Sequence, residues 1–147
     1  MATWGVALKT LVKWSPVVFA AVRKYYPYLQ NNPAAQRFTS QLVEQTARIP
    51  EKLSPDLRAQ RKIDAVRKSL AEAAVLGVDP VQYASWRADL DEMTRILALS
   101  KAASRSRRRA IVREVNRRVD ALVAQILPAL VTKPAPDRQA PRELPSA

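Results

Sequence analysis

Apolar residues recur every three or four positions along most of this chain, which is the spacing of an amphipathic helix. The clearest stripes are Leu57, Ile63, Val66, Leu70, Ala73 and Ala74, then Tyr83, Trp86, Leu90, Met93, Ile96 and Leu97, and finally Ile111, Val115, Val119, Leu122, Ile126 and Leu130. No segment alternates apolar and polar residues as a half-buried strand does. The pattern predicts an all-α protein, a small helical bundle.

The ends of the helices are marked by local signals. A capping residue directly precedes proline at Ser15-Pro16, Asn32-Pro33, Ser54-Pro55 and Asp79-Pro80, so each pair places a side-chain acceptor at the N-cap and proline at the first helical position. Pro27, Pro50 and Gly77 are expected to end helices, Gly77 in a left-handed conformation. These signals predict helices at 3–14, 16–26, 33–49, 55–76, 80–100 and 104–131.

Three regions follow from this pattern. Residues 31–131 hold enough apolar stripes for one modest core, and the short link around Gly77 makes the helices on either side of it antiparallel neighbours. The segment 132–147 has four prolines and no apolar period, so we expect a disordered tail. Residues 1–30 differ in composition, and we expect them to form a separate amphipathic segment that binds a membrane interface or a partner.

The positive charge is concentrated in two stretches of the chain. The net charge is +12, yet residues 44–100 carry nine cations and nine acids, and residues 119–147 carry three of each. Residues 1–43 contain five cations and no acid, whereas residues 101–118 contain eight cations and one acid. Such clustering is typical of a protein that meets a polyanion, either an anionic membrane or a nucleic acid.

Composition argues against an enzyme. The chain has no His and no Cys, which removes the usual general base, the thiolate nucleophile and the common zinc ligands. Its two glycines belong to no phosphate-binding loop. We therefore expect no catalytic residues, no metal, no cofactor and no small-molecule substrate. The lack of cysteine also fits a reducing cytoplasm.

The N-terminal thirty residues interleave aromatic, apolar and basic side chains, the composition of an interfacial anchor. The predicted membrane-interface residues are Trp4, Leu8, Leu11, Trp14, Phe19, Tyr25 and Tyr26, with Lys9, Lys13, Arg23 and Lys24. A spanning helix is disfavoured, because two central lysines cost roughly 5–7 kcal/mol and the apolar residues return only about 2.4–5 kcal/mol. The alternative is that these aromatics pack on the bundle or on a protein partner.

The arginine block at 101–118 is the second candidate contact region. The predicted polyanion-binding residues are Arg105, Arg107, Arg108, Arg109, Arg113 and Arg117. The apolar repeat lapses between Ser100 and Arg109, so this stretch is expected to leave the core. The block has no signature of a helix-turn-helix, an RNA-recognition strand or a zinc finger, and it is also compatible with plain solvated arginines.

Three hypotheses of function remain. The first is a non-enzymatic protein at the cytoplasmic face of an anionic membrane, held by the N-terminal segment and the arginine block together. The second is a nucleic-acid-associated protein that uses the arginine block, and the third is an adaptor whose N-terminal helix packs on a partner protein or on another copy of the chain. The first is favoured, because nucleic acid leaves the N-terminal aromatics without a role.

Overall fold

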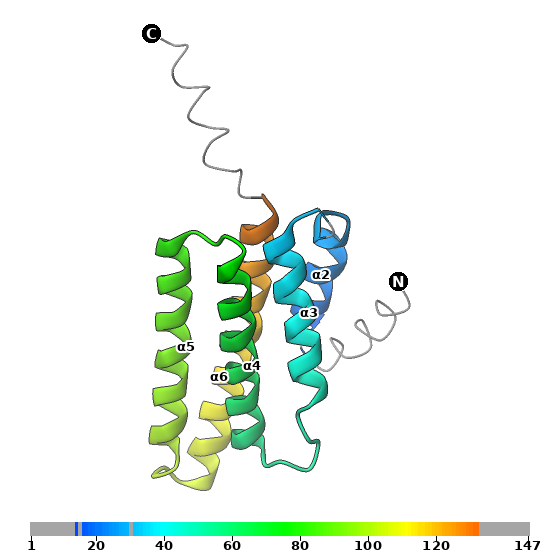
Figure 1. Ribbon diagram of the computed structural model, residues 1–147. Helices are drawn as coiled ribbons and strands as arrows, with labels where there is room; N and C mark the ends of the chain where they lie inside the picture. The colour runs from blue at the N-terminus through cyan, green and yellow to red at the C-terminus, as the bar shows by residue number, and fades with distance from the viewer. Residues whose placement is uncertain (1–13, 15, 30, 133–147) are drawn as a thin grey trace, which may run out of the picture.

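The computed structural model describes residues 14, 16–29 and 31–132, and within these ranges the regular structure is entirely α-helical. The helices are α2 (Pro16–Leu29), α3 (Pro33–Ala47), α4 (Pro55–Val75), α5 (Pro80–Ser100) and α6 (Arg105–Thr132). They lie side by side as a bundle, with α4 in front of α6 and with α2 and α3 beside them (Figure 1). The predicted all-α bundle is confirmed, whereas the predicted helix at 3–14 and the tail from residue 133 lie outside the described residues.

Helices begin where the paired capping residue and proline predicted them. The Asn32 side chain accepts a hydrogen bond from the Ala35 N–H at 3.0 Å, and the Asp79 carboxylate accepts one from the Gln82 N–H at 3.3 Å. Ser54 also occupies an N-cap, but its hydroxyl donates to Asp56 instead of accepting from the backbone. Caps therefore position α3 and α5 directly, while α4 starts on its proline.

Helix ends agree less uniformly with the predictions. Gly77 follows α4 with a φ of +113°, the conformation expected of it. Pro27, by contrast, does not end α2, which continues to Leu29. Proline lacks only its own N–H, so Pro27 removes one hydrogen bond, to the Arg23 carbonyl, and that loss falls in the last turn of the helix. The loss of a single hydrogen bond at this position does not shorten α2.

Replacing Gly77 with alanine is expected to destabilise the fold by about 1 to 2 kcal/mol. A Cβ at this position would have no atom within 4 Å, so the cost comes from the positive φ alone. Gly77→Asn should cost less, since asparagine tolerates left-handed backbone better than alanine. Urea denaturation followed by circular dichroism measures both, and an alanine variant as stable as the parent chain would contradict this reading.

The core includes α2. Val18 and Val22 are completely buried, and they join one cluster with residues of α3, α4, α5 and α6. The loop after α2 is also tied to α6, because the Asn32 side chain donates to the Leu130 carbonyl at 2.6 Å. The boundary predicted at residue 30 therefore does not separate two packing units, because the apolar stripe of α2 is buried in the core of the bundle.

Candidate polyanion-binding surface

The first turns of α6 project from the core. Residues 104–110 are all exposed, which confirms that this stretch leaves the core where the apolar repeat lapses. The Ser104 hydroxyl accepts a hydrogen bond from the Arg107 N–H at 3.3 Å and caps the helix. These turns stand at the lower end of the bundle in Figure 1, beside the link from α5.

Arg108 has a different role from the other arginines of this block. Its guanidinium donates to the carbonyls of Ser100, Lys101 and Ala103, at 3.3, 3.1 and 3.4 Å. The last carbonyls of a helix lack intrahelical partners and carry partial negative charge, so a cation is stabilising there. Arg108 therefore caps the end of α5 with its Nε and Nη2 donors.

A second basic segment joins the same end of the bundle. The Ser54 hydroxyl holds the pKa of Asp56 below its ordinary value, and the nearby Arg108 adds to this effect, so the start of α4 lies close to the start of α6. Together 48–58 and 101–109 contain eight cations and two acids, a net charge of +6. The cations are Arg48, Lys52, Arg58, Lys101, Arg105, Arg107, Arg108 and Arg109.

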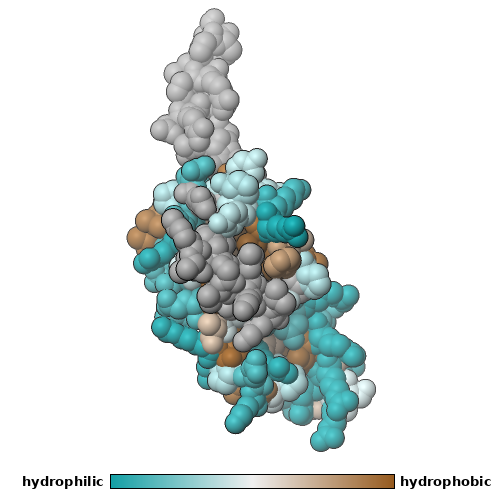
Figure 2. Space-filling view, turned by 90° about the vertical axis from the view of Figure 1, so that its right-hand side faces the viewer, coloured by the Kyte–Doolittle hydropathy of each residue, from teal (hydrophilic) through white to brown (hydrophobic). Residues whose placement is uncertain are grey.

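These two segments form a basic end of the bundle, although Arg48 is paired with Glu44 of α3. Long hydrophilic side chains project from this lower end in Figure 2. Lys52 and Arg58 were missed from the sequence because residues 44–100 are neutral as a whole. The usable signal was local, since 48–58 already holds three cations against two acids.

A separate basic surface runs where α2 lies against α6. Val17, Arg113 and Arg117 line one shallow depression between the two helices. Lys24 and Tyr28 lie seven and eleven residues after Val17, so they continue the same stripe of α2. We call Val17, Lys24, Tyr28, Arg113 and Arg117 the α2–α6 face, and all five side chains are exposed.

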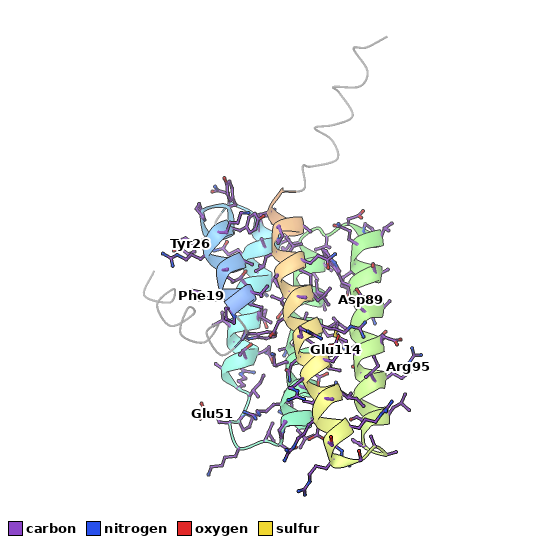
Figure 3. The ribbon with its side chains drawn as sticks, turned by 180° about the vertical axis from the view of Figure 1, so that it is seen from behind. Phe19, Tyr26, Glu51, Asp89, Arg95 and Glu114 are labelled. Atoms are coloured by element: carbon purple, nitrogen blue, oxygen red, sulfur yellow. The ribbon has the colours of Figure 1, made fainter. Side chains whose placement is uncertain are left out.

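The aromatic rings of α2 are divided between two sides of that helix. Tyr25 lies with its ring centroid 5.5 Å from the Lys24 Nζ and 6.5 Å from the Tyr28 ring, next to the α2–α6 face. Phe19 and Tyr26 are half-buried, and Figure 3 shows them on the side of α2 turned away from α6. Arg23 is exposed. The predicted interface residues of α2 therefore do not form one continuous surface.

Trp14 was predicted to contact a membrane, but the structure buries its side chain. Its side chain is only 4% exposed, and its indole N–H donates to the Thr46 hydroxyl at 3.0 Å. The Lys62 Nζ lies 4.4 Å from the centroid of the Trp14 ring, within the range of a cation–π contact. Trp14 is part of the core and does not present its ring to a membrane, because α3 and α4 provide both an apolar seat and a polar partner.

Lys62 belongs to a nearly buried polar cluster. Its ammonium donates to the Asp120 carboxylate at 2.9 Å and to the Asn116 side chain at 3.2 Å. The Lys62 and Asp120 side chains are 16% and 11% exposed. The sequence did not reveal this pair, because Lys62 and Asp120 are 58 residues apart in the chain. A cleft of about 580 Å³ opens beside it, lined by Trp14, Thr46, Ile49, Pro50, Glu51, Pro55, Arg58, Lys62 and Asn116.

The remaining predicted contacts divide into three groups. Trp4, Leu8, Lys9, Leu11 and Lys13 lie outside the described residues. Arg105, Arg107, Arg109 and Arg113 are exposed. Arg117 is exposed too, but it forms an ion pair with Glu114 one turn earlier in α6. The arginine block therefore exposes side chains both at the end of the bundle and on the α2–α6 face.

The described residues were also searched for membrane-spanning helices and metal sites, and the chain was compared with known proteins. Among the described residues, no helix is both long and apolar enough to cross a membrane. No three His, Cys, Asp or Glu side chains in the same part of the chain gather as a metal site. The chain matches no protein-family model, no curated protein and no solved structure.

Proposed function

We propose that the protein is a non-enzymatic peripheral protein that docks on the cytoplasmic face of an anionic membrane through the α2–α6 face. The observation that carries this proposal is the packing of α2 alongside α6. Lys24 comes from the first basic stretch of the sequence, and Arg113 and Arg117 come from the second. Val17 lines one depression with Arg113 and Arg117, and Lys24 follows Val17 by seven residues on the same stripe of α2. Figure 3 shows α2 beside α6 from behind.

The side chains of this face suit the headgroup region of a bilayer. Each Lys or Arg near an anionic leaflet contributes about 1 kcal/mol, and Glu114 beside Arg117 offsets part of that gain. Tyr28 and Val17 are 58% and 56% exposed, and a tyrosine with an apolar ring and polar hydroxyl prefers the membrane interface. The face thus combines electrostatic attraction with a small apolar contact.

The burial of α2 determines how such docking works. Because Val18 and Val22 face the core, α2 rests on the membrane with its outer side and does not insert its apolar stripe. Weak anchors need a second signal for stable attachment, and residues 1–13, with Trp4, Lys9 and Lys13, precede α2 in the chain. Deleting residues 1–30 would also remove core residues, so point substitutions are the sharper test.

Substituting Lys24, Arg113 and Arg117 together with alanine is expected to weaken binding to anionic vesicles about 100-fold. Three cations at about 1 kcal/mol each amount to about 3 kcal/mol, and every 1.4 kcal/mol is tenfold. Co-sedimentation with phosphatidylserine-containing vesicles, compared with neutral phosphatidylcholine vesicles, measures the change.

The matched control replaces Arg61, Lys68 and Arg87, which are exposed cations of α4 and α5. Both triple variants lower the net charge by the same amount, so only the position differs. Retained binding in the control and lost binding in the α2–α6 variant would support the proposal. Equal binding of the two variants would refute docking through this face.

A further inference from the structure

The exposed turns at the start of α6 carry cations in opposite directions. Successive residues of an α-helix are rotated by about 100°, so Arg105 and Arg109 lie on one side of the helix and Arg107 on the opposite side. Arg107 lines a depression with Ile96 of α5. The exposed turns therefore carry cations on two sides, with Arg107 on the side next to α5.

A flat bilayer contacts only one side of a helix, whereas the two edges of a nucleic-acid groove lie on opposite sides of a helix seated in it. The major groove of B-DNA is about 12 Å wide, which admits an α-helix of about 10–12 Å diameter, and phosphates line both of its edges. We propose that Arg105, Arg107 and Arg109, the arginine tip, seat in the major groove of duplex DNA and bind phosphates on both sides.

The surroundings of the tip add charge and rigidity. Lys52, Arg58 and Lys101 are exposed at the same end of the bundle, and they supply further cations for phosphates outside the groove. Arg108 is a positioning residue here, because its bonds to the Ser100, Lys101 and Ala103 carbonyls fix the first turns of α6 against the end of α5. The tip is thus held in a defined direction relative to the bundle.

The binding is expected to be independent of base sequence. Phosphate contacts position a protein on DNA without reading its sequence. Asparagine is a common reader of adenine, but Asn116, the asparagine of α6, donates to the Val112 carbonyl and accepts from Lys62. Its amide is engaged within the bundle, so Asn116 does not read adenine, and the arginines of the tip are assigned to phosphates and not to base edges.

The first experiment measures binding of the full chain to a labelled mixed-sequence DNA duplex by fluorescence anisotropy over a series of salt concentrations. Substituting Arg105, Arg107 and Arg109 with alanine should lower the affinity at least tenfold and reduce the slope of log affinity against log salt by about 3, since each phosphate contact contributes about 0.9. These side chains are exposed, so the helical content and the melting temperature should not change. An unchanged salt slope would overturn the proposal.

Two further measurements separate the possible partners. Duplex RNA should bind more weakly than duplex DNA, because the deep, narrow major groove of A-form RNA does not admit a helix; equal affinities would refute seating in the groove. The Lys24, Arg113 and Arg117 triple variant should keep most of its DNA affinity. If the arginine-tip variant instead lost vesicle binding and kept DNA binding, the tip would belong to the membrane surface and the DNA proposal would fail independently of the α2–α6 face.

Discussion

Replacing Asp120 with alanine is expected to lower the free energy of unfolding by about 3 to 5 kcal/mol. The Lys62 ammonium, whose side chain is only 16% exposed, would lose the carboxylate with which it is paired. Asn116 would remain as a hydrogen-bond partner at 3.2 Å, but a neutral amide does not balance the charge. Trp14, which lies over the same ammonium, would be disturbed as well.

Urea denaturation followed by far-UV circular dichroism tests this prediction, with two controls. Glu114→Ala removes the exposed partner of Arg117 and should cost no more than about 1 kcal/mol. The double variant Lys62→Met/Asp120→Leu replaces the pair with apolar side chains of similar size and should recover most of the stability. An Asp120→Ala variant no less stable than Glu114→Ala would show that the pair is effectively solvated.

Helix boundaries could be predicted because their causes are local. A cap such as Asn32 acts on an N–H three residues away, and the strain at Gly77 depends on its own φ angle. Both signals can be read within a few residues of sequence. The prediction that Pro27 ends α2 was wrong for a related reason. The sequence shows that proline removes one hydrogen bond, but it does not show that the last turn of α2 can form without that bond.

The partners of each helix could not be predicted in the same way. An apolar stripe shows that a helix face is buried. It does not show in what the face is buried, because a lipid interior and a protein core favour the same side chains. The composition of residues 1–30 therefore predicted a membrane contact, with packing on the bundle as the alternative, whereas Val18 and Val22 of α2 are buried in the core. Only the packing against α6 decides between them. Lys62 and Asp120 are likewise separated by 58 residues, and no local rule connects them.

Local charge balance was similarly misleading for the basic end of the bundle. Lys52 and Arg58 lie in a region that is neutral overall, yet the fold places them beside the start of α6. Arg108 looked like its neighbours in the sequence, although the fold turns it back onto α5. The charge at the end of a bundle depends on which helix ends lie side by side in the fold. Counting charges along the sequence therefore identifies the arginine block but not the cations that lie near it in space.

The second large effect concerns α2 itself. Val22→Asp is expected to destabilise the protein by about 4 to 7 kcal/mol at neutral pH, because burial raises the pKa of a carboxyl by about 3–5 units and each unit corresponds to about 1.36 kcal/mol. Val22 is completely buried in this structure. The loss cannot exceed the free energy that α2 contributes by packing, since the helix can detach as a unit and leave the new carboxylate in water.

Ala20→Asp provides the matched control, since Ala20 is exposed on the same helix and the variant carries the same added charge. It should change the stability by no more than about 0.5 kcal/mol. The difference between the two variants in urea denaturation should shrink as the pH falls, because the raised pKa allows the buried carboxyl to become neutral. Equal stabilities at neutral pH would mean that α2 is an appendage whose apolar stripe is free for a membrane. A large difference would mean that any membrane contact uses the outer side of α2, where Lys24 and Tyr28 lie.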